Sequence, residues 1–164
     1  MLFPSLSAAE RFVTNESNGF IWIQQGKAYP ILVDSQEDKG VLRAVANLQT
    51  DAGKVTGATP EIIHSPSGNR MLIVGSVENS SWIKQLMQAG KIPATDLKGQ
   101  REKYILQTVK QPVEGVEEAI VIAGSDKRGT IYGIYELSRQ MGVSPWYFWA
   151  DVPVEKHDII SIKE

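Results

Sequence analysis

The segment from Gly124 to Gly129 has the residue types and spacing closest to a known binding motif. Its sequence, Gly-Ser-Asp-Lys-Arg-Gly, has the two-glycine frame of a phosphate loop, and it lies between an apolar run typical of a strand and the start of an expected helix. Backbone N–H groups at such a helix start favour anions. The candidate residues of this loop are Ser125, Asp126, Lys127 and Arg128.

The residues that follow this loop favour a structural role for it instead. A phosphate loop continues with Lys-Ser/Thr after its second glycine, and this chain continues with Thr130-Ile131. Without that lysine, no side chain of the motif reaches a β- or γ-phosphate. We therefore expect the two glycines to form a tight strand-to-helix turn, with Ser125 or Asp126 capping the helix. A phosphate- or nucleotide-binding domain that uses this loop is an alternative function.

An aromatic cluster, Trp146 to Trp149, follows the same expected helix. Aromatic faces can stack on sugar rings, so Trp146, Tyr147 and Trp149 are candidates for substrate binding or for contact with another domain. Four consecutive residues of a strand cannot share one face, because alternate side chains point in opposite directions. Such a patch is also too apolar to stay bare on a soluble monomer. Part of the cluster is therefore expected to be buried or covered by a partner.

The remaining chemistry-bearing residues give no pattern for catalysis or metal binding. The two histidines, His64 and His157, are far apart in the sequence, and there is no cysteine. No Gly-x-Ser-x-Gly segment presents a serine nucleophile. We expect no metal site and no cofactor. A glycosidase needs two carboxylates across a cleft, and the sequence brings no two together, so we interpret the following as solvated or capping groups: Asp34, Asp38, Asp126 and Asp151.

The composition predicts one domain that binds neither nucleic acid nor membranes. The chain has 164 residues, and its 17 Lys and Arg nearly balance 19 Asp and Glu, for a net charge of −2. There is no basic patch for nucleic acid and no apolar run long enough for a membrane helix. The first residues lack the features of a signal peptide. Either the chain stays inside the cell, or a signal peptide was removed from it.

Short apolar runs rich in β-branched residues predict the strands that hold these segments. The expected strands are Phe20–Ile23, Ile31–Val33, Ile62–Ile63, Met71–Val74, Tyr104–Val109, Ala119–Ala123 and Ile159–Ile162. Gly26 indicates a hairpin between the first two, and the Ser65–Asn69 turn indicates another hairpin.

Helices are expected between the strands. An apolar stripe at helical spacing predicts the first, with a capping pattern of Ser35 and Asp38 before it and Gly57 after it. The stripe consists of Val41, Val45, Leu48, Ala52 and Val55. The second helix is expected from Ser81 to Ala89, and the third from Gly129 to Gln140 with Ile131, Ile134, Tyr135 and Met141 inward. Together these elements predict an α/β (α+β) fold, a two-layer mixed sheet with about three helices mostly on one face.

The run from Ala123 to Val154, which holds both the loop and the aromatic cluster, resembles the signature of glycoside hydrolase family 115. Shorter runs at Tyr29–Ser35, Val41–Asp51 and Asp51–Pro60 are similar to the opening of the same family. A weaker similarity, at Arg128-Gly129 and Tyr132-Gly133, extends to the N-terminal domains of β-hexosaminidases and other α-glucuronidases. Members of family 115 are α-glucuronidases that remove (4-O-methyl-)glucuronic acid from xylan.

This resemblance implies a zincin-like topology without zinc and a non-catalytic role. In the family such a domain precedes a TIM barrel whose strand-end loops hold the catalytic residues, and no catalytic position of the family matches this chain. The implied divisions are a flexible or extended N-terminus (1–18), an accessory domain (19–154) and a strand leading to the barrel (155–164). The implied partners are that barrel and a xylan-derived oligosaccharide. The implied parent is a secreted or periplasmic bacterial protein. An autonomous carbohydrate-binding module is the alternative that the aromatic cluster supports.

Overall fold

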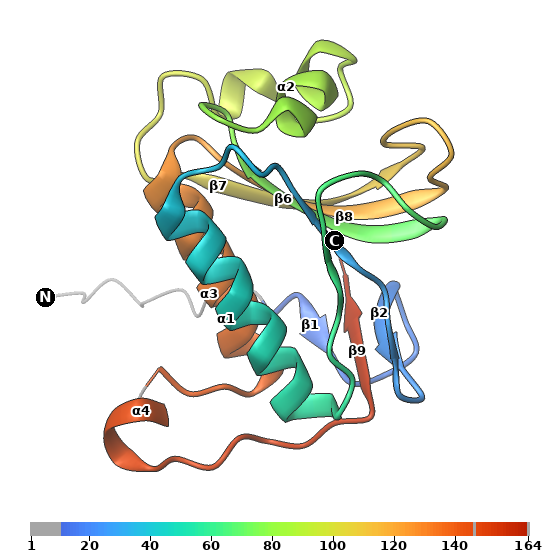
Figure 1. Ribbon diagram of the computed structural model, residues 1–164, viewed down its shortest axis with the longest axis vertical. Helices are drawn as coiled ribbons and strands as arrows, with labels where there is room; N and C mark the ends of the chain where they lie inside the picture. Colours follow the sequence, from blue (N-terminus) through green and yellow to red (C-terminus); the bar gives the residue numbers. More distant parts are fainter. Residues whose placement is uncertain (1–10, 146, 164) are drawn as a thin grey trace, which may run out of the picture.

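The computed structural model describes residues 11–145 and 147–163, which form two β-sheets and a set of helices. In Figure 1 the long helices α1 and α3 lie side by side along one face of the larger sheet, α2 covers its other face, and the smaller sheet lies below. The helices are α1 (Lys39–Thr56), α2 (Ser81–Gln88), α3 (Lys127–Met141) and the short α4 (Tyr147–Ala150), with a 3₁₀ turn at Ala94–Asp96. The expected mixed α/β fold with three main helices is confirmed.

The larger sheet has five strands in the order β5-β4-β6-β8-β7. Its strands are β4 (Ile31–Val33), β5 (Ile62–Ile63), β6 (Arg70–Ser76), β7 (Tyr104–Lys110) and β8 (Glu118–Gly124). β5, β4, β6 and β8 are parallel, and β7 is antiparallel to β8. The hairpin expected at the Ser65–Asn69 turn is wrong, because β5 and β6 both run parallel to β4, which lies between them.

The smaller sheet is antiparallel, in the order β1-β9-β2-β3. Its strands are β1 (Val13–Thr14), β2 (Phe20–Gln24), β3 (Lys27–Ala28) and β9 (Ile159–Ile162). Gln25 and Gly26, with φ of 52° and 73°, form the tight turn between β2 and β3. A hairpin therefore forms at Gly26 as expected, but its second strand is β3, and Ile31–Val33 enters the larger sheet instead.

The core forms on both faces of the larger sheet. Leu72 and Val74 of β6 pack with α1, α3 and the smaller sheet, whereas Met71 and Ile73 pack with α2. All five residues of the predicted α1 stripe are buried in the first cluster, with at most 1% of their surface exposed. The expectation that helices lie mostly on one face thus holds for α1 and α3 but not for α2.

Helix ends and orientations follow the sequence with two corrections. Asp38, not Ser35, caps α1, because its carboxylate accepts from Gly40 N. Gly57 ends α1 and Gly142 ends α3, both in the left-handed conformation. Tyr135, expected inward, is 44% exposed, and Leu137 is buried instead. Within the part of the chain that the structure describes, no helix is both long and apolar enough to cross a membrane.

Candidate functional site

The loop after β8 is closed by the Asp126 carboxylate. Asp126 Oδ1 accepts from Gly129 N at 2.7 Å, which makes Asp126 the N-cap of α3, and Oδ2 accepts from Glu102 N at 2.9 Å. The hydrogen bond from Gly129 is the largest of the effects that lower the pKa of Asp126. The expected capping role is confirmed for Asp126. The helix N–H group that would meet a bound anion already has a carboxylate partner.

The two glycines of this loop allow close approach of neighbouring backbone. A Cβ added to Gly129 would lie 2.2 Å from the carbonyl oxygen of Lys103, and one added to Gly124 would lie 2.1 Å from Thr130 Oγ1. Neither glycine has a positive φ. Any larger residue would push the β8–α3 turn away from the β7 side of the sheet, so the frame that resembles a phosphate loop has a packing explanation.

The charged residues of the loop pair with neighbours within the chain. Arg128 Nη1 lies 2.8 Å from Glu102 Oε1, and Lys127 Nζ lies 3.7 Å from Asp38 Oδ2. Both pairs are solvent-exposed and therefore add little stability. The structure brings the four predicted loop residues together at the start of α3, but their contacts are internal, and the phosphate-binding alternative gains no support from them.

Glu37, which follows β4, is a buried carboxylate that the sequence did not single out. It is 5% exposed, Oε1 accepts from Ser76 N at 2.6 Å, and Oε2 accepts from Asp38 N at 3.2 Å. The Ser76 hydroxyl also donates to it, at 2.9 Å. Burial raises the pKa of Glu37 despite these hydrogen bonds. The group ties the β4–α1 connection to the end of β6 and is too enclosed to reach a substrate.

Asp34 is a second carboxylate at the same edge of the sheet, and it is more exposed than Glu37. Its Oδ2 accepts from Ser81 N at 3.0 Å and from Ser81 Oγ at 2.6 Å, so it binds the first turn of α2. Burial acts to raise the pKa of Asp34, but the hydrogen bonds from Ser81 and Gln36 outweigh it, and the net shift is downward. Ligands often bind at the carboxyl ends of parallel strands. At this edge, the carboxylates of Asp34 and Glu37 instead accept hydrogen bonds from backbone N–H groups of the chain.

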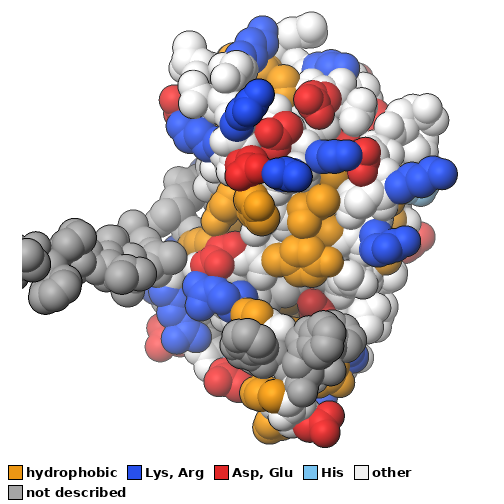
Figure 2. Space-filling view, turned by 90° about the vertical axis from the view of Figure 1, so that its left-hand side faces the viewer, with side chains coloured by type: hydrophobic (Ala, Val, Ile, Leu, Met, Phe, Trp, Pro, Cys, Tyr) orange, Lys and Arg blue, Asp and Glu red, His pale blue; other side chains and the backbone are white. Residues whose placement is uncertain are grey.

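A groove runs between the outer faces of α1 and α3, with a cavity volume of about 340 Å³. We call this the α1–α3 groove; its lining includes Asn47, Asp51 and Lys54 of α1 and Tyr135, Ser138 and Arg139 of α3. Figure 2 shows this side of the molecule, where hydrophobic side chains gather in the middle and charged side chains surround them. In the sequence, Asp51 beside the apolar stripe of α1 is the one signal for this groove, which we did not predict.

Asp51 and Ser138 form the buried polar part of the α1–α3 groove. They are 7% and 3% exposed, and they come from facing positions on the two helices. Burial raises the pKa of Asp51, while the Ser138 hydroxyl and the charge of Lys54 act in the opposite direction. Across the groove, Asn47 Nδ2 donates to Tyr135 Oη at 2.9 Å and holds the tyrosine in place. The groove thus combines an exposed ring with a buried acceptor.

The predicted aromatic cluster lies beyond the end of α3. Residues 147–150 form a helical turn, so their side chains do not alternate as they would in a strand. Tyr147 is partly buried against the core, and the Lys54 ammonium lies 4.3 Å from its ring centroid. Trp146 and the side chain of Trp149 lie outside the described residues. The structure therefore brings Tyr147 next to the α1–α3 groove through Lys54.

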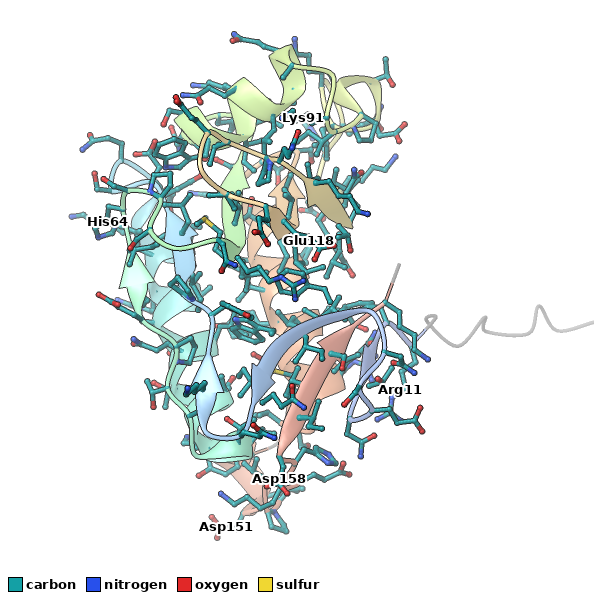
Figure 3. The ribbon with its side chains drawn as sticks, turned by 90° about the vertical axis from the view of Figure 1, so that its right-hand side faces the viewer. Arg11, His64, Lys91, Glu118, Asp151 and Asp158 are labelled. Atoms are coloured by element: carbon teal, nitrogen blue, oxygen red, sulfur yellow. The ribbon has the colours of Figure 1, made fainter. Side chains whose placement is uncertain are left out.

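The two histidines lie far apart. His64 Nδ1 lies 2.9 Å from the carbonyl oxygen of Val33, and His157 Nδ1 lies 3.3 Å from Asn15 Nδ2. Figure 3 shows His64 at the larger sheet and Asp158, the neighbour of His157, at the opposite end of the molecule. They cannot share a ligand. The described residues contain no group of three or more His, Asp or Glu side chains placed to hold a metal ion.

Comparison with known proteins points to one group of enzymes. The family model described as glycosyl hydrolase family 67 N-terminus matches residues 24–137. No curated protein matches the chain. Among solved structures, a family GH115 4-O-methyl-α-glucuronidase with specificity for decorated arabinogalactans is 31% identical, with a TM-score of 0.68 over 85% of this chain. The matched region spans 17% of that protein's length.

The chain is also similar to solved structures at lower sequence identity. The structure named CpGH84D is 10% identical over 99% of this chain and 23% of its own, with a TM-score of 0.50. A Streptomyces plicatus β-hexosaminidase mutant is 15% identical over 89% of this chain and 24% of its own, with a TM-score of 0.43. The first of these supports the arrangement of the elements alone.

Proposed function

The chain belongs to the family described as glycosyl hydrolase family 67 N-terminus, and from that premise we propose that it is the non-catalytic accessory domain of a larger α-glucuronidase. The observation that supports this most strongly is the 31% identity to a short part, 17%, of a 4-O-methyl-α-glucuronidase. The substrate that we propose for the parent enzyme is glucuronoxylan. The catalytic groups would then come from a TIM barrel rather than from this domain.

The described carboxylates support a non-catalytic role. Glycoside hydrolysis needs one carboxyl group as acid and another as base or nucleophile, both reaching the substrate. Asp38 and Asp126 cap helices, Asp34 binds the start of α2, and Glu37 is enclosed by Ser76 and its own backbone. Each of these four groups already stabilises local structure, which would be disturbed if it also transferred protons to a substrate.

We further propose that the side of the molecule formed by α3 faces the catalytic barrel. The loop Ser125–Arg128 lies at the start of α3, and the segment that holds Trp146, Tyr147 and Trp149 follows its end. A helix of 15 residues separates the two by roughly 22 Å. Both ends could contact a neighbouring domain while the α1–α3 groove between them borders the substrate cleft.

An activity assay tests the accessory role. The purified chain should release no glucuronic acid from glucuronoxylan, because the catalytic groups would come from the barrel and Asp34, Glu37, Asp38 and Asp126 already hold local structure. A separately produced protein that continues the reading frame after Glu164 into a (β/α) barrel should contain the activity. Release of glucuronic acid by the chain alone, at a level that survives removal of contaminating hydrolases, would contradict the proposal.

A further inference from the structure

The α1–α3 groove has features that its role in packing does not require. Asp51 is 7% exposed, and among the described residues the groups that act on its carboxyl are the Ser138 hydroxyl and the Lys54 charge. A buried carboxylate is costly unless several donors satisfy it, as Ser76 and Asp38 satisfy Glu37. The acceptor capacity of Asp51 at the wall of an open groove is suited to donors from a ligand.

A planar ring and oriented polar groups lie around this acceptor. The Tyr135 ring is 44% exposed, and its hydroxyl is fixed by the Asn47 amide from the other helix. The Arg139 guanidinium is held by Glu136 through two hydrogen bonds of 2.8 and 2.6 Å. These groups are positioned before any ligand arrives, which lowers the entropy cost of binding.

The charges around the groove balance. Lys54 and Arg139 of the lining are cationic, and Asp51 of the lining is a carboxylic acid. Glu136, outside the lining, pairs with Arg139, and the hydrogen bond from Arg139 lowers the pKa of Glu136 so that it stays ionised. A groove built for an anion would have an excess of cations. A neutral ligand with many hydroxyls fits better, since each hydroxyl both donates and accepts.

We propose that the α1–α3 groove is a binding site for a neutral saccharide, with a pyranose ring against Tyr135 and its hydroxyls donating to Asp51. The apolar C–H face of a pyranose suits an aromatic ring, and vicinal hydroxyls suit a carboxylate in a groove that also holds an amide and a guanidinium. A cavity of about 340 Å³ lies within the size range of small-ligand sites. The site as proposed is built on Tyr135 and Asp51 of the groove lining, and it does not depend on where the parent enzyme's catalytic groups lie.

Titration of the full ¹⁵N-labelled chain with xylopentaose, and separately with a neutral arabinogalactan oligosaccharide, tests the proposal by NMR. We expect saturable shifts at Asn47, Asp51 and Ser138 with at least one of the two sugars. Tyr135→Ala should weaken binding about tenfold, as expected for loss of a central aromatic contact. Asp51→Asn, which keeps the shape and removes the charged acceptor, should weaken it as well.

Tyr132→Ala is the matched control, because Tyr132 is a 49% exposed tyrosine of the same helix that does not line the groove. The saccharide affinity of the Tyr132→Ala variant should stay within about twofold of that of the unchanged chain, a difference well below 1 kcal/mol. Absence of saturable shifts with both sugars would overturn the proposal, and so would binding that Tyr135→Ala leaves unchanged. Neither result would bear on the activity assay, so failure here is separable from failure of the accessory role.

Discussion

Glu37 and Asp51 are two buried carboxylates in similar surroundings but with different partners. They are 5% and 7% exposed, and burial raises the pKa of both. Glu37 accepts from the backbone and hydroxyl of Ser76 and from Asp38 N, which join two loops at one edge of the larger sheet. Asp51 faces the Ser138 hydroxyl and the Lys54 charge beside an open groove.

The difference shows how burial alone fails to assign a role. A carboxylate whose acceptor sites are filled by the chain stabilises that chain, and its removal leaves buried donors unpaired. A carboxylate that is buried with fewer donors lowers stability at neutral pH, and such a residue is typical of a ligand-binding site. The effect of substitutions on stability separates the two cases.

Leu48→Ala should cause the largest loss, about 2–5 kcal/mol of unfolding free energy, as for other large-to-small changes in a core. Leu48 is fully buried and lies one turn before Asp51 on α1, so it measures how firmly the sheet holds the helix that places Asp51. Urea denaturation followed by circular dichroism provides the measurement.

Asn47→Ala is the control for this change, because Asn47 is on the groove side of the same helix and should cost about 0.5 kcal/mol or less. A loss below about 0.5 kcal/mol for Leu48→Ala would mean that α1 is not packed against the sheet as described. The contrast between the two buried carboxylates would then lose its structural basis.

The inner face of α1 was predictable from the sequence, and the roles of Glu37 and Asp51 were not. The stripe from Val41 to Val55 repeats at helical spacing, and hydrophobic burial produces that repeat directly. A buried carboxylate leaves no periodic signal, because its partners come from distant parts of the chain, as Ser76 does for Glu37. Tyr135, which was expected inward, is 44% exposed.

Pairing between strands was the least predictable part of the fold. The strand positions agree with the short apolar runs, yet Ile31–Val33 joins the larger sheet rather than the hairpin at Gly26. Turn residues show where the chain reverses, but they do not say which strand it meets next. The Asp126 cap could be predicted because it is a local feature, in which the partner Gly129 is three residues away.

Glu37→Ala should cause an intermediate loss, about 1–3 kcal/mol, because the Ser76 N–H and hydroxyl and the Asp38 N–H lose their buried acceptor. Urea denaturation at neutral pH provides the comparison with the unchanged chain. Gln36→Ala, a change of the exposed neighbouring side chain, should stay within about 0.5 kcal/mol. Equal effects of the two changes would show that the Glu37 hydrogen bonds do not hold this edge of the sheet together.

Asp51→Asn should have the smallest effect on stability and the opposite sign. Because burial raises the pKa of Asp51 above its ordinary value of 3.8, the folded chain binds this proton more tightly than the unfolded chain does. The stability that this group contributes is therefore fully present below the unfolded pKa and is lost as pH rises through the folded pKa. Asparagine keeps the shape without the charge, so the variant should be at least as stable as the unchanged chain at pH 7.

The pH dependence of this difference identifies its cause. Asp34, Asp126 and Glu136 have lowered pKa values and lose stability as pH falls, but they are present in both proteins and cancel in the comparison. The stability advantage of Asp51→Asn over the unchanged chain should thus shrink as pH falls below the ordinary value of Asp51, where the carboxyl is neutral in both states. A difference that stays constant with pH, or a variant less stable at pH 7, would mean that Asp51 is satisfied within the chain like Glu37. A gain in stability together with weaker saccharide binding would instead mark Asp51 as a residue of the groove's ligand site.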